Sequence, residues 1–155
     1  MGGLRKALAL ARDTRGIAAM EAVIVAPVLM LLTFGAADGA WYFIQTHKME
    51  TGLSAGGSYL AQTAGTTTDE ARARRLAVTG SLGSTGKPRI AGWSSADVTI
   101  TYPSRTTSVA LRDGANTRVA RLSTSVPYKG LGVISGVRGR QPLSLSATFE
   151  TRIAG

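Results

Sequence analysis

Arg15-Gly16-Ile17-Ala18-Ala19-Met20-Glu21 opens the stretch that decides the fold of this chain. From Ile17 to Ile44 the sequence holds only two charged residues, Glu21 and Asp38. An α-helix needs about 20 predominantly apolar residues to cross the hydrocarbon core of a bilayer. Residues 17–44 are therefore predicted to form one transmembrane helix, and the aromatic run Trp41-Tyr42-Phe43 is typical of its far interface.

The charges that precede this helix predict its orientation. Residues 1–16 contain one acid, Asp13, and several basic side chains: Arg5, Lys6, Arg12 and Arg15. Basic residues beside a transmembrane helix stay on the cytoplasmic side of the membrane. We therefore expect a cytoplasmic amino terminus, a single membrane crossing, and export of the rest of the chain, residues 45–155.

Glu21 is costly at its place in an apolar helix. An Asp-like charge at mid-bilayer costs roughly 2.5–3.5 kcal/mol on insertion scales and less near the edge, so an ionisable residue there indicates a function. Basic residues, a glycine and then an apolar helix with a carboxylate at its fifth position resemble a prepilin-type signal, with residues 1–16 as its leader. Two other interpretations stay open, a cleaved secretory signal peptide and a plain signal anchor in which Glu21 is incidental.

The order and spacing of Gly16, Ala18, Ala19, Glu21 and Pro27 resemble the opening of TadE-like proteins. These are the pseudopilins of bacterial tight-adherence (Tad, type IVb) pilus systems. The resemblance implies a minor pilin or pseudopilin of the bacterial inner membrane that aids pilus assembly or tip formation and so supports surface adhesion. Its partners would be the membrane, other pilin subunits and the pilus assembly machinery. Such a protein is structural, with neither enzymatic activity nor a cofactor.

The resemblance also implies roles for single residues. A prepilin peptidase would cut between Gly16 and Ile17, while the basic leader holds that bond in the cytoplasm. Glu21 would become the fifth residue of the product and pair with a new amino terminus, because two unpaired charges in a low-dielectric bundle are costly. That pairing would set the register of assembly. Pro27 lacks the backbone N–H of a helical residue and is expected to kink the helix, which membrane helices tolerate.

The remainder of the chain predicts an α+β domain of pilin-like architecture. The spacing of His47, Met49, Leu53 and Leu60 predicts that the first helix continues to about Gln62, with weakening glycines. A second helix is expected to begin at a Thr68 cap and to end near Thr79-Gly80. Alternating patterns then predict about four mostly antiparallel strands with one apolar face: Asp97–Tyr102, Thr107–Leu111, Thr117–Val126 and Leu143–Ile153.

The glycine-rich segment Tyr128–Gly136 is predicted to be an apolar loop. Its leucine, valine and isoleucine side chains leave two placements open. The loop lies either on the membrane surface or a neighbouring subunit, or on the core of its own domain.

The sequence offers little catalytic chemistry. It has no cysteine and a single histidine, His47, so neither a thiolate nor a histidine metal site is predicted. Gly52-Leu53-Ser54-Ala55-Gly56 matches the G-x-S-x-G nucleophile elbow, but that motif needs a strand before it and a helix after it. No catalytic residue is proposed.

The net charge of +9 is spread over the predicted helices, loops and strands. Nucleic acid is therefore disfavoured as a partner, since few aromatic residues accompany the basic ones. Anionic lipid or acidic surface polymers are at least as compatible, and a solvated basic surface is favoured over both. The competing function from another class is an uncleaved, membrane-anchored periplasmic scaffold or ligand-binding module.

Overall fold

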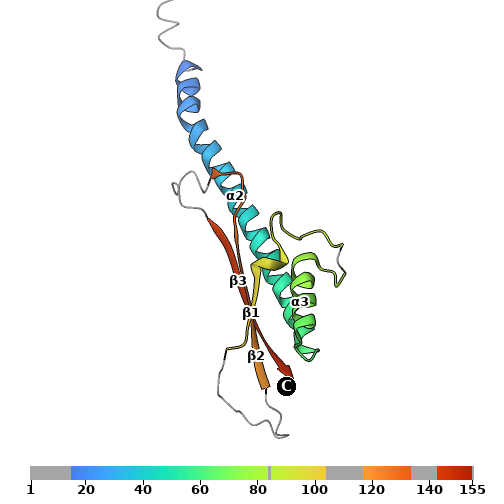
Figure 1. Ribbon diagram of the computed structural model, residues 1–155. Helices are drawn as coiled ribbons and strands as arrows, with labels where there is room; N and C mark the ends of the chain where they lie inside the picture. The colour runs from blue at the N-terminus through green and yellow to red at the C-terminus, as the bar shows by residue number, and fades with distance from the viewer. Residues whose placement is uncertain (1–14, 84, 104–116, 134–142, 155) are drawn as a thin grey trace, which may run out of the picture.

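The computed structural model describes residues 15–83, 85–103, 117–133 and 143–154. They form a long helix, a short second helix and a three-stranded sheet, which confirms the predicted α+β class (Figure 1). The elements in chain order are α2 (Arg15–Ala61), α3 (Thr67–Thr79), the 3₁₀ turn η1 (Ser95–Asp97), β1 (Val98–Thr101), β2 (Thr117–Pro127) and β3 (Ser144–Ala154).

Helix α2 is a single element of 47 residues, about 70 Å long at 1.5 Å per residue. Its first half projects beyond the rest of the molecule, and its second half lies against α3 and the sheet (Figure 1). The predicted continuation past the apolar stretch is confirmed, because the helix ends at Ala61. Met49, Leu53 and Leu60 are fully buried on its packed face. His47 also lies in this helix, with its side chain 72% exposed beside Glu50.

Three glycines set the close packing of α2. A Cβ atom on Gly52 would lie 2.4 Å from the carbonyl oxygen of Ala77 in α3, and one on Gly56 would lie 2.8 Å from that of Ala73. A Cβ atom on Gly57 would lie 2.6 Å from the ring of Phe149 in β3. These glycines therefore bring the backbone of α2 against its neighbours. The G-x-S-x-G pattern lies inside a helix, so it lacks the strand–turn–helix setting of a nucleophile elbow.

The N-cap of helix α3 lies two residues before the predicted one. Thr66 is the N-cap residue, and its Oγ1 accepts the N–H of Asp69 at 3.3 Å. The Asp69 carboxylate in turn accepts the backbone N–H of Thr66 at 3.2 Å and its hydroxyl at 2.7 Å. This reciprocal capping box explains why Thr66 replaces the predicted Thr68, since Thr66 has the acidic partner three residues on. The predicted end is confirmed, because Gly80 caps the helix with φ 74°.

The sheet has the order β1-β2-β3, and both strand pairs are antiparallel. Leu122 in β2 lies opposite Ile100 in β1 and Phe149 in β3, on the face that α2 covers. The alternation predicted for residues 143–153 is confirmed by the buried side chains of Leu145 and Ile153. The predicted strand Thr107–Leu111 lies outside the described residues.

Trp93 packs between helix α2 and the sheet. Its side chain is 1% exposed, and its indole N–H donates to the hydroxyl of Thr124 in β2 at 3.0 Å. The indole ring also lies over Gly52, where a Cβ atom would approach it to 2.9 Å. The hydrogen bond satisfies two polar groups inside the core, so this tryptophan can be buried completely.

Candidate functional site

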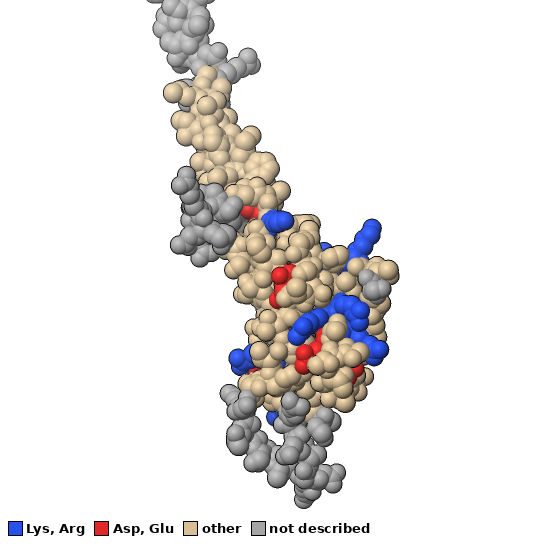
Figure 2. Space-filling view, viewed as in Figure 1, with Lys and Arg blue, Asp and Glu red and all other residues tan. Residues whose placement is uncertain are grey.

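The first half of α2 is an exposed apolar surface. Its large apolar side chains are between 44% and 72% exposed: Met20, Val23, Ile24, Val25, Val28, Leu29, Met30, Leu31, Leu32 and Phe34. On the face that Figure 2 shows, this part of the molecule is uncharged, and the charged groups gather lower down over α3 and the sheet. Burying one such side chain stabilises by about 1.5–3 kcal/mol, so an apolar environment is strongly preferred.

Length and composition qualify this helix to cross a membrane. The qualifying helix covers Ala19–Ala61, and none of its apolar 18-residue window is buried within the protein. The one hydroxyl group in the most apolar part, on Thr33, donates to the carbonyl oxygen of Leu29 at 2.7 Å. A polar side chain satisfied within its own helix suits a hydrocarbon environment.

The residues predicted for processing and assembly lie at the free end of α2. Gly16 is exposed, and a Cβ atom there would meet nothing within 4 Å. Glu21 is also exposed, and Pro27 lies inside the helix, which continues through it. Arg15 is the first residue of the helix. The predicted leader residues Arg5, Lys6 and Arg12 lie outside the described residues.

Asp38 lies where the exposed first half of α2, here called the free half, meets the domain. Asp38 is fully buried, and its Oδ1 accepts the hydroxyl of Tyr128 at 2.6 Å and the backbone N–H of Leu131 at 2.9 Å. The Tyr128 ring packs edge-on against Tyr42 in α2, with ring centroids 5.2 Å apart. We call these contacts between α2 and the segment Tyr128–Leu131 the Asp38 clasp.

The Asp38 clasp depends on a protonated Tyr128 hydroxyl and on the absence of a side chain at residue 130. Burial raises the pKa of the Tyr128 phenol, and its hydrogen bond to the Asp38 carboxylate raises that pKa further. The hydroxyl therefore remains a hydrogen-bond donor throughout the physiological pH range. Between the two contact points, a Cβ atom on Gly130 would lie 2.3 Å from Asp38 Oδ1 and 2.2 Å from the Tyr128 hydroxyl. Only a glycine fits there without displacing the clasp.

The clasp divides two groups of residues that the sequence analysis treated together. In the aromatic run, Tyr42 packs on Tyr128, while Trp41 and Phe43 remain 48% and 69% exposed. In the described part of the predicted loop, residues 128–133, Tyr128 packs against the core, whereas Leu131 is 65% exposed. The rest of that loop lies outside the described residues. The sequence signal for Asp38 was a lone carboxylate in an apolar stretch, but its partners lie 90 or more residues away.

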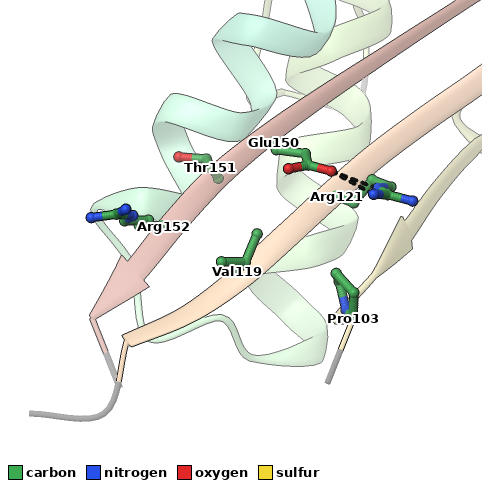
Figure 3. Close-up of a pocket in the computed structure, with 6 residues that line it drawn as sticks. All are labelled: Pro103, Val119, Arg121, Glu150, Thr151 and Arg152. Atoms are coloured by element: carbon green, nitrogen blue, oxygen red, sulfur yellow. Dashed lines mark hydrogen bonds and ion pairs between the residues drawn. The ribbon is translucent and has the colours of Figure 1, made fainter. Parts of the chain in front are cut away.

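The surface hollows of the domain show no catalytic arrangement. One, of about 290 Å³, lies on the outer face of the sheet between Pro103, Val119 and Arg152 (Figure 3). There the Arg121 guanidinium binds the Glu150 carboxylate across β2 and β3, with Nη2 at 2.6 Å and Nε at 2.8 Å from Oε1. This cross-strand ion pair engages two of the charged side chains that line the hollow, Arg121 and Glu150.

A second hollow, of about 350 Å³, lies between α3 and η1. Arg74, Arg75 and Ser95 line it, and Arg74 is already paired with Glu70 at 3.4 Å. Within the described part of the chain, no group of three or more His, Asp or Glu side chains is placed to hold a metal ion. The exposed helix and its clasped junction are therefore the candidate functional site.

A comparison with protein families supports this choice. Residues 16–57 match the family model described as TadE-like protein. No curated protein and no solved structure matches the chain. The matched segment begins at the glycine before the apolar helix and ends at Gly57, which packs on the sheet, so it contains both the free half of α2 and Asp38. Residues 16–57 are therefore similar to TadE-like proteins, as the spacing of Gly16, Glu21 and Pro27 predicted.

Proposed function

We propose that this protein is a pilin-like structural subunit of a Tad pilus system. Within that system it acts as a minor pilin or pseudopilin that aids pilus assembly or tip formation, and thereby surface adhesion. The observation that carries the proposal is a TadE-like segment whose apolar helix projects, exposed, from a small α+β domain. The helix anchors and packs the subunit, and the domain is exported.

The span we propose for the membrane is residues 17–37, shorter than the apolar stretch in the sequence. The clasp buries Asp38 and half-buries Tyr42 against the domain, so Asp38 marks the point at which α2 turns from lipid to the domain. Residues 17–37 are about 32 Å long at 1.5 Å per residue, which suits a hydrocarbon core about 30 Å thick. The basic residues before it place the amino terminus in the cytoplasm and the domain in the periplasm.

Processing at Gly16–Ile17 by a prepilin peptidase is part of the proposal. Gly16 is exposed in the first turn of α2, and helix ends fray readily, so a protease can take up this bond in extended form. The leader residues Arg5, Lys6, Arg12 and Arg15 hold it on the cytoplasmic side. After cleavage Glu21 lies one turn from the new amino terminus, and pairing the carboxylate with an amine offsets the cost of both charges in an apolar bundle.

The proposal is tested by the intact mass of the protein extracted from membranes of its native host, with and without its prepilin peptidase. We expect a product that begins at Ile17 only when the peptidase is present. Gly39→Ala serves as a matched control for Gly16→Ala, because neither glycine has a neighbour within 4 Å of its Cβ position. Only Gly16→Ala should block cleavage. A full-length mass in both hosts would contradict processing and favour an uncleaved periplasmic scaffold.

A further inference from the structure

The Asp38 clasp holds the loop that follows β2 at one level of the long helix. Leu131 donates its backbone N–H to Asp38, so it lies beside the turn of α2 at which the free half ends. We propose that the segment Tyr128–Leu131 of this loop is a second membrane contact of the domain. In this inference, Leu131 inserts into the outer interfacial layer of the same bilayer that α2 spans, and the clasp sets its depth. The inference rests on the proposed anchoring by α2.

The height of the loop supports this partner. With Gly16 at the inner boundary of the hydrocarbon core, a helix rising 1.5 Å per residue reaches the outer boundary after about 20 residues, close to Asp38. The clasp therefore positions Leu131 at the boundary between hydrocarbon and headgroups. Its side chain is 65% exposed in the protein, and an apolar side chain at this depth is buried in the membrane instead.

The aromatic residues at the same height favour lipid over a protein partner. Trp41 and Phe43 are 48% and 69% exposed, and residues two apart in a helix point about 200° apart around its axis. A single protein partner covers one face of a helix, whereas an interfacial lipid layer surrounds it. Exposed aromatics on opposite faces at one level are therefore explained by lipid.

The charges around the junction agree with a headgroup layer. Lys129, in the segment bound by Asp38, is exposed. Lysine side chains extend toward the headgroups while apolar neighbours lie deeper. Asp38 itself is enclosed by the clasp, and its hydrogen bonds compensate a buried carboxylate that lipid could not solvate.

The absence of cysteine allows a direct test with single environment-sensitive labels. The full chain would carry Leu131→Cys, Leu82→Cys or Val28→Cys, each labelled with NBD, in vesicles of phosphatidylcholine and phosphatidylglycerol. Leu82 is the matched control, an exposed leucine in the loop after α3. We expect spin-labelled lipids to quench Leu131→Cys at shallow depth and Val28→Cys at greater depth, both several-fold more than Leu82→Cys.

The outcomes separate this inference from the proposed anchoring. If Val28→Cys is quenched and Leu131→Cys is quenched no more than Leu82→Cys, the loop contact is wrong while the anchor stands. If Val28→Cys is not quenched, anchoring itself fails. A blue-shifted Leu131→Cys label that lipid does not quench would mean that a protein surface covers the loop, which also overturns the inference.

The role of the clasp is tested in the same vesicles with Tyr128→Phe. This change removes the hydroxyl that binds Asp38 and should reduce quenching at Leu131→Cys severalfold. Tyr102→Phe is the matched control, because it removes a tyrosine hydroxyl that donates to Glu70 at 2.7 Å far from the clasp. Equal quenching in both variants would show that the clasp does not set the depth of the loop.

Discussion

At the scale of single residues, two kinds of position tolerate substitution least. One is a buried carboxylate with hydrogen-bond partners, and the other is a glycine packed against the backbone of another element. Asp38 is a buried carboxylate whose acceptor capacity is used by a side chain and a backbone N–H from the loop after β2. Gly52 and Gly56 also lie at a contact between segments, because the backbone of α3 packs where a Cβ atom on either glycine would collide with it. In each case a small local feature determines how two distant segments meet.

Gly52→Ala tests the glycine contacts. We expect this change to lower the free energy of unfolding of the domain by about 1–3 kcal/mol, the usual cost of overpacking, although alanine favours helix more than glycine does. Thermal unfolding of the full chain in detergent micelles measures the effect. Gly39→Ala in the same helix is the control, since nothing lies within 4 Å of its Cβ position. Equal melting temperatures for the two variants would contradict the packing role.

At the scale of elements, α3 shows how a helix start is chosen by local hydrogen bonds. Thr66, Thr67 and Thr68 are all threonines, and any of them could serve as a cap by residue type. Thr68 has no acidic residue three positions on, and Glu70, which follows Thr67 at that spacing, binds Tyr102 and Arg74 instead. Thr66 and Asp69 form the reciprocal pair. The hydrogen bonds from Thr66, through its side chain first and its backbone second, hold the pKa of Asp69 below its usual value.

Thr66→Ala should therefore destabilise the domain by about 1 kcal/mol, the usual loss for an N-cap, and Thr68→Ala should not. The pKa of Asp69 is lower in the folded protein, so its stabilisation is present above the unfolded-state pKa and is lost as pH falls through the folded-state pKa. Thermal unfolding between neutral pH and pH below about 4 would show it. Thr66→Ala should lose less stability on acidification than the wild type. A parallel acid dependence in both proteins would argue against the capping box.

At the scale of the whole molecule, one helix serves two environments. Its first half offers apolar side chains all around, and its second half packs on α3 and the sheet (Figure 1). The clasp lies at the change from one to the other, so it fixes where the domain sits along the helix axis. In the proposed function, assembly into a filament or complex depends on the free half, which contains Glu21.

Glu21→Gln tests assembly separately from processing. We expect normal cleavage before Ile17 but a loss of about tenfold or more in incorporation, since an unpaired buried charge costs several kcal/mol. The measurement compares the sheared surface fraction with the membrane fraction of the native host. Glu50→Gln on the same helix is the control, because Glu50 is exposed beside His47 in the domain half. Normal incorporation of Glu21→Gln would rule out the register role.

The sequence by itself determined the elements whose causes are local. An apolar run, an alternating pattern or a glycine after a periodic segment acts through nearby residues. For this reason α2, the carboxyl-terminal end of α3 and the inward face of β3 could be predicted from the sequence. The TadE-like segment was recognisable for the same reason, from Gly16 to Pro27.

Only the tertiary structure decided the contacts that join distant segments. Asp38 meets Tyr128 and Leu131 from 90 or more residues away, and Gly52 meets Trp93 and Ala77 only after α3 has packed. In the sequence, Asp38 was an isolated charge and the glycines were weak points of a helix. Burial and close approach depend on which surfaces of the folded chain come together, and a local sequence pattern carries no information about that. The fold therefore makes Asp38 a hydrogen-bonded junction and the glycines of α2 close packing points.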